Sequence, residues 1–268
     1  MTRIRPAAIA GTFYEGDPAV LDRTITGFLN TALKDAGPLD SLTVPKAVIA
    51  PHAGHIYSGK AAADAYIRFA PARETITKVV LLGPCHRVAV RGLATTSADE
   101  WVTPLGRVPI DRDAIATVSE LPFVHVHDGA HAQEHSLEVH LPFLQKLLPS
   151  FSLIPFAVGQ ATNEEVAQVL DALWGGPETA IVISSDLSHF LPYDEARALD
   201  GRTASAIEGF DWASIGRDQA CGRVPISGLL TSAKIRGMRI DRVALCNSGD
   251  TAGSKDRVVG YGAWTLTE

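Results

Sequence analysis

Histidine residues follow short apolar runs at separate points of this chain, and imidazole is well suited to metal binding and to proton transfer near neutral pH. His52 comes just after Ala47–Ala50, and His86 comes just after Lys78–Leu82. An imidazole in a loop needs a partner, and several imidazoles that converge indicate a metal ion. We therefore predict that His52 and His86 are metal ligands. Two histidines with one weaker ligand and open positions are typical of non-haem iron.

A third polar segment, Ser184-Ser-Asp-Leu-Ser-His189, follows the apolar run Ala180–Ile183. An aspartate that orients a histidine sets its tautomer and raises its basicity. We predict that His189 acts as a general base or acid, with Asp186 as its partner or as a metal ligand. The structural alternative is that Asp186 caps the next turn while His189 packs beside Phe190.

The segment His131-Ala-Gln-Glu134-His135 matches the H-x-x-E-H pattern of some zinc peptidases. On one helix, His131 and His135 would share a face and Glu134 would activate water, which predicts a zinc hydrolase. Asp128-Gly129 directly precedes the segment, so it spans a loop and a helix start more readily than a continuous helix. The alternative is therefore that Glu134, His135 and the nearby His140 line the first site and bind substrate.

The segment Gly54-His-Ile-Tyr-Ser-Gly-Lys60 has the G-x-x-x-x-G-K spacing of a phosphate-binding loop. Ala61 follows it, where that motif requires Ser or Thr to hold Mg²⁺. Bulky residues inside the loop would also obstruct phosphate. The spacing therefore does not predict a nucleotide site, although backbone amides at a helix start can bind an anionic group.

Three cysteines, Cys85, Cys221 and Cys246, lack C-x-x-C spacing and cannot all pair. Free thiols are typical of a reducing compartment, which predicts a cytoplasmic protein. The residues after Met1 contain no apolar signal core. Cys85 precedes His86 and is a candidate thiolate ligand, but a small buried Cys is the commoner outcome. We expect Cys246 in the core and assign Cys221 no role.

Strand-like apolar runs alternate with helix-like segments, which predicts one α/β domain over residues 1–268 with a mostly parallel central sheet and helices on both faces. Ligands bind such sheets beyond the carboxyl ends of the strands. A fourth polar segment, Asn247-Ser-Gly-Asp-Thr251, follows the strand Arg242–Cys246 and is expected at the same edge. Helices are predicted over Lys60–Phe69, Asp111–Ser119 with Asp111 as cap, His135–Leu148, Asn163–Leu173 with Asn163 as cap, Asp194–Glu208 and Ile226–Arg236. Further strands are predicted over Ser152–Val158 and Val258–Leu266, and a hairpin over Leu93–Ile110.

The composition is that of an ordinary globular protein. The 268 residues are 46% hydrophobic and 20% charged, which excludes a disordered chain. The 24 Lys and Arg against 30 Asp and Glu give a net charge of −6, which argues against nucleic-acid partners. No run of about 18 apolar residues exists, so we expect no membrane span.

Several ordered motifs together resemble the Memo family, which in prokaryotes is protein B of the AmmeMemoRadiSam system. The motifs run over nearly the whole chain: Arg5-Pro-Ala-Ala-Ile-Ala-Gly-Thr-Phe-Tyr, Ala50-Pro-His-Ala-Gly-His-Ile-Tyr-Ser-Gly, Gly83-Pro-Cys-His, Glu134-His-Ser-Leu-Glu-Val-His-Leu-Pro-Phe, Ser184-Ser-Asp-Leu-Ser-His and Val259-Gly-Tyr-Gly-Ala. The resemblance implies the fold of class III extradiol dioxygenases. It also implies radical-SAM and AMMECR-type partner proteins.

The resemblance further implies metal ligation by His52 and His86, a catalytic base at His189, and Asp186 close to it. A Cys is the third ligand in animal members of the family. Counted back from Tyr261, that position falls on Thr251, which we place in the substrate-binding set. The third ligand stays open among Asp186, His189, Asp250 and water.

These observations predict a metal-dependent enzyme, with iron or alternatively copper or zinc, and with redox or dioxygenase-like chemistry on an unidentified small molecule. One rival is a non-catalytic accessory protein of a radical-SAM-associated system. The other is the zinc hydrolase of His131, Glu134 and His135.

Overall fold

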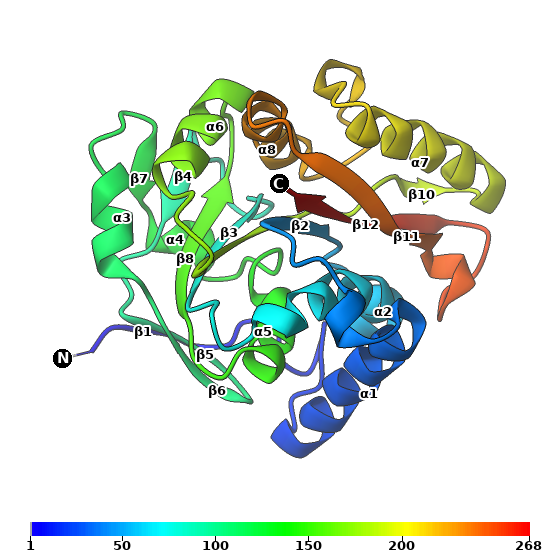
Figure 1. The fold of residues 1–268 in the computed structure, drawn as a ribbon, viewed down its shortest axis with the longest axis horizontal. Helices are drawn as coiled ribbons and strands as arrows, with labels where there is room; N and C mark the ends of the chain where they lie inside the picture. The colour runs from blue at the N-terminus through cyan, green and yellow to red at the C-terminus, as the bar shows by residue number, and fades with distance from the viewer. Residues whose placement is uncertain (1) are drawn as a thin grey trace.

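The computed structural model describes residues 2–268 and contains a large mixed sheet between two layers of helices (Figure 1). Parallel strands form the middle of this sheet in the order β2, β9, β3, β8. Their bounds are β2 (Ala47–Ala50), β9 (Thr179–Ser184), β3 (Lys78–Pro84) and β8 (Ser152–Val158). The predicted parallel sheet is confirmed in this part of the molecule, and its carboxyl ends share one edge.

Both margins of the sheet contain antiparallel pairs. On one side, β12 (Val258–Thr267) lies antiparallel to β2 and carries β11 (Arg239–Asn247) and β10 (His189–Leu191). On the other side, β4 (Leu93–Thr95) lies antiparallel to β8 and parallel to β7 (Val124–Val126). The sheet is thus parallel where it carries the polar segments after β2, β3 and β9.

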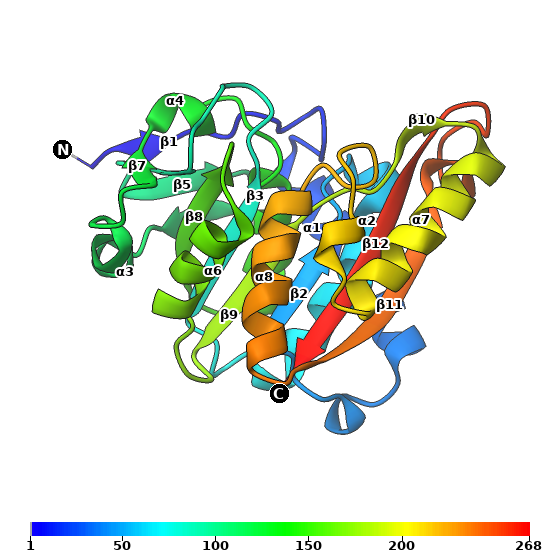
Figure 2. The same ribbon diagram turned by 90° about the horizontal axis from the view of Figure 1, so that it is seen from above.

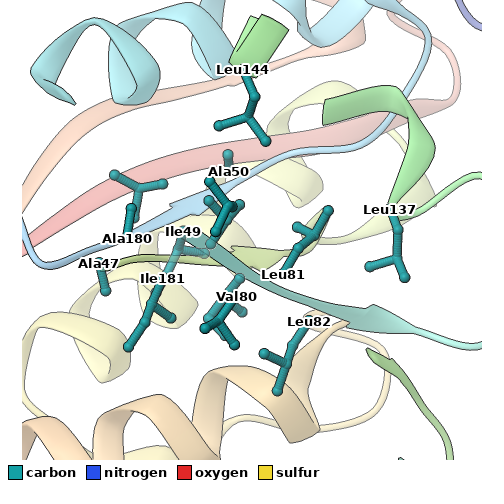
Figure 3. Close-up of a cluster of buried hydrophobic side chains, with 14 of the residues drawn as sticks. Ala47, Ile49, Ala50, Val80, Leu81, Leu82, Leu137, Leu144, Ala180 and Ile181 are labelled. Carbon is teal, nitrogen blue, oxygen red and sulfur yellow. The ribbon is translucent and has the colours of Figure 1, made fainter. Parts of the chain in front are cut away.

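The middle strands are apolar except at their ends because helices cover both of their faces. Every residue of β2 and β9 is buried, which is typical of a parallel sheet enclosed on both sides. In Figure 3, Val80 and Leu82 point to one face and Leu81 points to the other, as the two-residue period of a strand requires. Leu144 packs onto the sheet from the helix on one of these faces.

Helices from different parts of the chain form the two covering layers (Figures 1 and 2). One layer contains α1 (Pro18–Ala36), α2 (His55–Tyr66) and α5 (Leu141–Leu147). The other contains α6 (Asn163–Ala172), α7 (Tyr193–Glu208) and α8 (Arg223–Ile235). The sequence analysis did not identify α1, although its buried residues Leu21, Ile25, Leu29 and Ala32 have helical spacing.

A small three-stranded sheet lies beside the large one. It consists of β1 (Ile4–Arg5), β5 (Glu100–Thr103) and β6 (Gly106–Pro109). The hairpin predicted over Leu93–Ile110 is confirmed for β5 and β6 only, because Leu93–Thr95 forms β4 of the large sheet. The remaining elements are short: α3 (Arg112–Val118), α4 (Asp128–His131), and 3-10 turns at Leu39–Ser41, Ile67–Ala72, Glu138–His140, Trp212–Ser214 and Ser248–Asp250.

Several predicted helix ends need correction. Asp111 caps α3 as predicted, but α6 is capped by Thr162 and not by Asn163. The helix predicted from His135 forms only from Leu141, after a 3-10 turn, because Pro142 fits the first turn of a helix and not its interior. No helix within residues 2–268 is long and apolar enough to cross a membrane.

Candidate metal centre

Three histidine side chains meet at the carboxyl-end edge of the parallel strands. His52 follows β2 across Pro51, His86 follows β3 across Cys85, and His135 lies in the irregular segment between α4 and α5. One ring nitrogen from each of the three lies within 4.8 Å of the others. The ring centroids are 5.3 Å apart for His52 and His86, and 4.7 Å apart for His86 and His135. The structure therefore brings the two predicted ligands together and adds His135 to them.

Hydrogen bonds fix the tautomer of His52. Its Nδ1 lies 2.6 Å from the Ser184 hydroxyl, which itself donates to the carbonyl of Ser136 at 2.6 Å. A hydroxyl has one proton, so the Ser184 oxygen must accept from His52. The proton is thus on Nδ1, and Nε2 keeps the lone pair that a metal ligand requires.

Glu134 lies behind the other two rings and is hydrogen-bonded to one of them. Its Oε1 accepts from His86 Nδ1 at 2.9 Å and lies 3.2 Å from His135 Nδ1. The His135 contact is not aligned as a hydrogen bond, and Nδ1 of this ring has no other partner within residues 2–268. A carboxylate behind a histidine is the usual second layer of a metal site, where it sets the ring orientation and raises the basicity of the ligand.

Burial favours the neutral form of the His52 and His135 rings. It lowers the pKa of His52 well below the ordinary value, and the neighbouring His86 and His135 lower it further. Burial also lowers the pKa of His135 to about 4, against the opposing effect of Glu134. Burial alone would raise the pKa of Glu134, but hydrogen bonds from His86 and backbone amides bring it to about 2. Neutral imidazoles backed by an ionised carboxylate are ready to bind a cation at neutral pH.

Two further groups lie beside the free nitrogen of His52. The Sγ of Cys221 is 3.3 Å from Nε2, and Oδ2 of Asp186 is 3.9 Å from it. Asp186 also accepts from the backbone amides of His52 and Ala53 through Oδ1. Burial raises the pKa of Asp186 to about 6 and that of Cys221 to about 12. Both groups contact His52, but neither joins the group of three ring nitrogens that could hold a metal ion.

Gly222 makes the approach of Cys221 possible. A Cβ at this position would lie 2.4 Å from the carbonyl oxygen of Ser184 and 2.6 Å from Cβ of Ser185, so only glycine fits. The Gly222 amide also donates to the Ser185 hydroxyl at 2.9 Å. The sequence analysis gave Cys221 no role because its neighbours in sequence include no histidine. The sequence does not show that Gly222 packs against Ser184 and Ser185, and this contact brings Cys221 to His52.

His189 lies near this centre but outside the group of three. Its side chain is exposed, and Nδ1 lies 2.8 Å from the carbonyl of Leu187, which can only accept. The predicted orienting role of Asp186 toward His189 is therefore wrong, because the Leu187 carbonyl fills it. The proton is again on Nδ1, so Nε2 is free to take up a proton. Phe190 follows with a φ of 60°, a strained conformation for a bulky residue that helps to fix the direction of this segment.

The zinc hydrolase predicted from H-x-x-E-H is wrong. The helix α4 ends at His131, so the motif residues do not share one helical face. His131 is buried, its Nε2 donates to the carbonyl of Ala94 at 3.0 Å, and its ring packs against Trp101. It is a core residue and does not belong to the group formed by His135.

The other candidates have different surroundings. His140 was expected to line the site, but it is 1% exposed and its ring lies 5.9 Å from that of Tyr66, below the surface. Thr251 is exposed at the end of the 3-10 turn Ser248–Asp250, where its hydroxyl donates to the Ser248 carbonyl. Of Cys221, Cys246 and Thr251, Cys221 is the one whose side chain contacts His52.

The phosphate-loop spacing does not form a phosphate loop. The helix α2 already begins at His55, and the His55 ring is buried with Nε2 donating to the Val139 carbonyl. Lys60 forms ion pairs with Asp35 and Asp64 on the surface. This lysine is therefore occupied, and the loop that would surround a phosphate is helical.

The donor set fits a divalent metal ion. Imidazole nitrogens are ligands for zinc, copper, iron and nickel, and three of them around one point leave positions open for other molecules. The buried Nδ1 of His135 has no hydrogen-bond partner among residues 2–268, as is expected of a donor set for a metal ion. A cavity of about 860 Å³ adjoins this centre and is lined by His86 and Cys221, among others.

Known proteins are similar to this chain over almost its whole length. The family profile described as Memo-like protein matches residues 5–265. The chain is 37% identical over 270 residues to a protein of Aquifex aeolicus (strain VF5) named MEMO1 family protein, with 97% of each chain covered. It is 35% identical over 276 residues to the MEMO1 family protein MTH_45 of Methanothermobacter thermautotrophicus, with 96% of this chain and 98% of the relative covered.

Proposed function

The chain belongs to the Memo family, and we propose that it is a metal-dependent enzyme that uses non-haem iron for redox chemistry on a small molecule. His52, His86 and His135 would hold the ion. The observation that carries this proposal is the convergence of their three ring nitrogens within 4.8 Å, with hydrogen-bond acceptors behind His52 and His86.

A bound Fe(II) would supply a redox centre with open positions for oxygen, which would be the oxidant, and for the organic molecule that is oxidised. The chain itself would supply proton transfer. His189 has a free Nε2 and is held in direction by the Leu187 carbonyl, so it would accept a proton from the organic molecule. Asp186, with a pKa of about 6, would assist beside His52.

The unequal burial of the metal centre supports the same role. His52 is 1% exposed and Asp186 is 4% exposed, whereas the His86 side chain is 29% exposed. Solvent and substrate would thus approach from the His86 side, where the cavity lies. Exclusion of water from the buried side strengthens the electrostatic effect of the metal ion on a bound molecule.

The test is anaerobic reconstitution with Fe(II), followed by measurement of oxygen uptake with catechol and 3,4-dihydroxybenzoate as probes. We expect one iron per chain and uptake that depends on the probe. Both are expected to be lost in His52→Ala and retained in His125→Ala, a control at an exposed histidine of β7. If the protein binds one copper or zinc ion per chain in place of iron, the proposed identity of the metal is wrong but the proposed ligands stand.

A different result would favour the accessory role. If the wild-type protein binds no metal, and His52→Ala changes only the capture of radical-SAM or AMMECR-type partners, the proposed enzyme is refuted. The three free cysteines agree with a cytoplasmic location, which we include in the proposal.

A further inference from the structure

The cavity beside the metal centre carries three arginines. Arg91, Arg217 and Arg223 line it together with His86 and Cys221. Within residues 2–268, none of the three guanidinium groups has a carboxylate within 4.0 Å or a hydrogen bond from its side chain, in contrast to Arg5, Arg107 and Arg236. These unpaired guanidinium groups give the cavity a local positive charge, although the net charge of the chain is −6.

The one carboxylate in the cavity lining is already engaged. Glu165 accepts from the Thr162 amide at 2.9 Å as part of the capping box of α6. It stabilises the start of α6 and forms no ion pair with any of the three arginines. Three arginines against one glutamate leave the cavity lining with a net positive charge.

The start of α8 adds to this charge. Cys221, Arg223 and Val224 line the cavity at the amino end of this 13-residue helix, which lies beside α6 in Figure 2. No side chain caps the helix and its first turn contains no acidic residue. The Val224 amide has no acceptor among the described residues. A free amide and a positive helix end favour an anion at the same place as Arg223.

The remaining lining is largely apolar. Val88, Val90 and Val158 come from the segments around β3 and β8, and Val224 and Pro225 come from the start of α8. A volume of about 860 Å³ is large enough for an organic molecule with a ring or a short chain. The cavity thus combines an apolar wall with cationic groups.

We propose that this cavity binds a small organic anion, with a carboxylate or phosphate held by Arg217 and Arg223 and an apolar body lying on the valines. The inference rests on the proposed function in one respect: it makes this anion the substrate of the adjoining metal centre. Recognition of the anionic group itself needs no metal. Guanidinium groups suit both oxyanions because they donate two parallel hydrogen bonds.

The test uses protein treated with EDTA and two probes of the same shape, benzoate and benzamide, with binding measured by NMR titration. We expect benzoate to bind at least about tenfold more tightly, as charge-assisted hydrogen bonds to an oxyanion require. The preference is expected to fall to about threefold or less in Arg223→Gln and in Arg217→Gln. Arg202→Gln, an exposed arginine of α7, is the control that should keep it. Phenyl phosphate in a parallel titration shows which of the two anions binds better.

Equal affinity for benzoate and benzamide would overturn the proposal, and so would a preference that survives in both variants. Circular dichroism checks the fold, and if Arg223→Gln does not fold, Arg217→Gln and Arg91→Gln decide. Co(II) binding by the same variants separates the two proposals. Loss of the benzoate preference with intact metal binding supports the anion site, whereas a wild-type chain that binds benzoate but no metal refutes only the metal function.

Discussion

Glu134 joins two of the three histidines of the metal centre, so its replacement tests how the rings are held. Oε1 accepts from the His86 ring and from the backbone amides of His135 and Ser136, while Oε2 accepts from the His86 amide. Glu134→Gln keeps the shape of the side chain but places an NH₂ group at one of these positions. That group cannot accept a hydrogen bond, so at least one buried donor loses its partner.

The size of the effect follows from these contacts. Loss of a carboxylate behind metal-binding histidines lowers metal affinity about 10- to 100-fold, which is about 1.4 to 2.7 kcal/mol of binding free energy. A buried donor without a partner lowers the free energy of unfolding by about 1–3 kcal/mol. Glu134→Gln therefore weakens the metal site and the fold together, and the two effects are measured separately.

The assay is competition between the protein and a chromophoric chelator for Zn(II) or Co(II), with urea denaturation in the absence of metal. Glu120→Gln, which changes an exposed glutamate, is the control and should behave as the wild type. If Glu134→Gln is folded and its metal affinity lies within about twofold of the wild type, Glu134 does not orient the ligands and the reasoning is refuted.

Two further predictions concern buried groups outside the metal centre. Burial lowers the pKa of His131 from 6.5 to about 4, helped by Arg5, so below pH 6.5 the unfolded chain takes up a proton that the folded chain does not. The free energy of unfolding therefore falls as the pH is lowered from 6.5 to 4. In urea denaturation at several pH values, His131→Gln should reduce the slope of unfolding free energy against pH by about 1 kcal/mol per pH unit. An unchanged slope would contradict the burial of a neutral His131. Arg5→Ala should lower the free energy of unfolding by about 3–5 kcal/mol, because it leaves the fully buried Glu138 carboxylate without its 2.6 Å partner. Arg3→Ala, at an exposed ion pair, should cost no more than about 1 kcal/mol, and equal effects of the two changes would refute the role of the buried pair.

The parallel centre of the fold could be predicted from the sequence because its strands are continuous apolar runs. The ends of β2 and β3 also placed His52 and His86 correctly, since parallel strands bring their carboxyl ends to one edge. The strands Arg242–Cys246 and Val258–Leu266 were also predicted and correspond to β11 and β12. Their antiparallel pairing, the short strands β7 and β10, and the helix α1 were not identified. The cap residue Asp17, which accepts from the Val20 amide, and the spacing of Leu21, Ile25 and Leu29 were visible in the sequence.

The roles of His135 and Cys221 depended on contacts that sequence spacing does not contain. His135 was assigned either to a zinc motif or to a cavity wall, because the pattern does not show that α4 ends at His131. Cys221 reaches His52 across 169 positions of the chain, through the close packing of Gly222 on Ser184. Such approaches are set by the packing of α8 against the sheet, which no local pattern specifies.

The central claim is that His52, His86 and His135 hold one metal ion, and titration of metal-free protein with Co(II), followed by visible absorption, tests it most directly. The account predicts one Co(II) per chain in the wild type and in His125→Ala. It predicts that the bands are lost in each of His52→Ala, His86→Ala and His135→Ala, with the fold of each variant checked by circular dichroism. Co(II) bands that persist unchanged in the three folded alanine variants, or a wild type that binds no Co(II), would contradict the account.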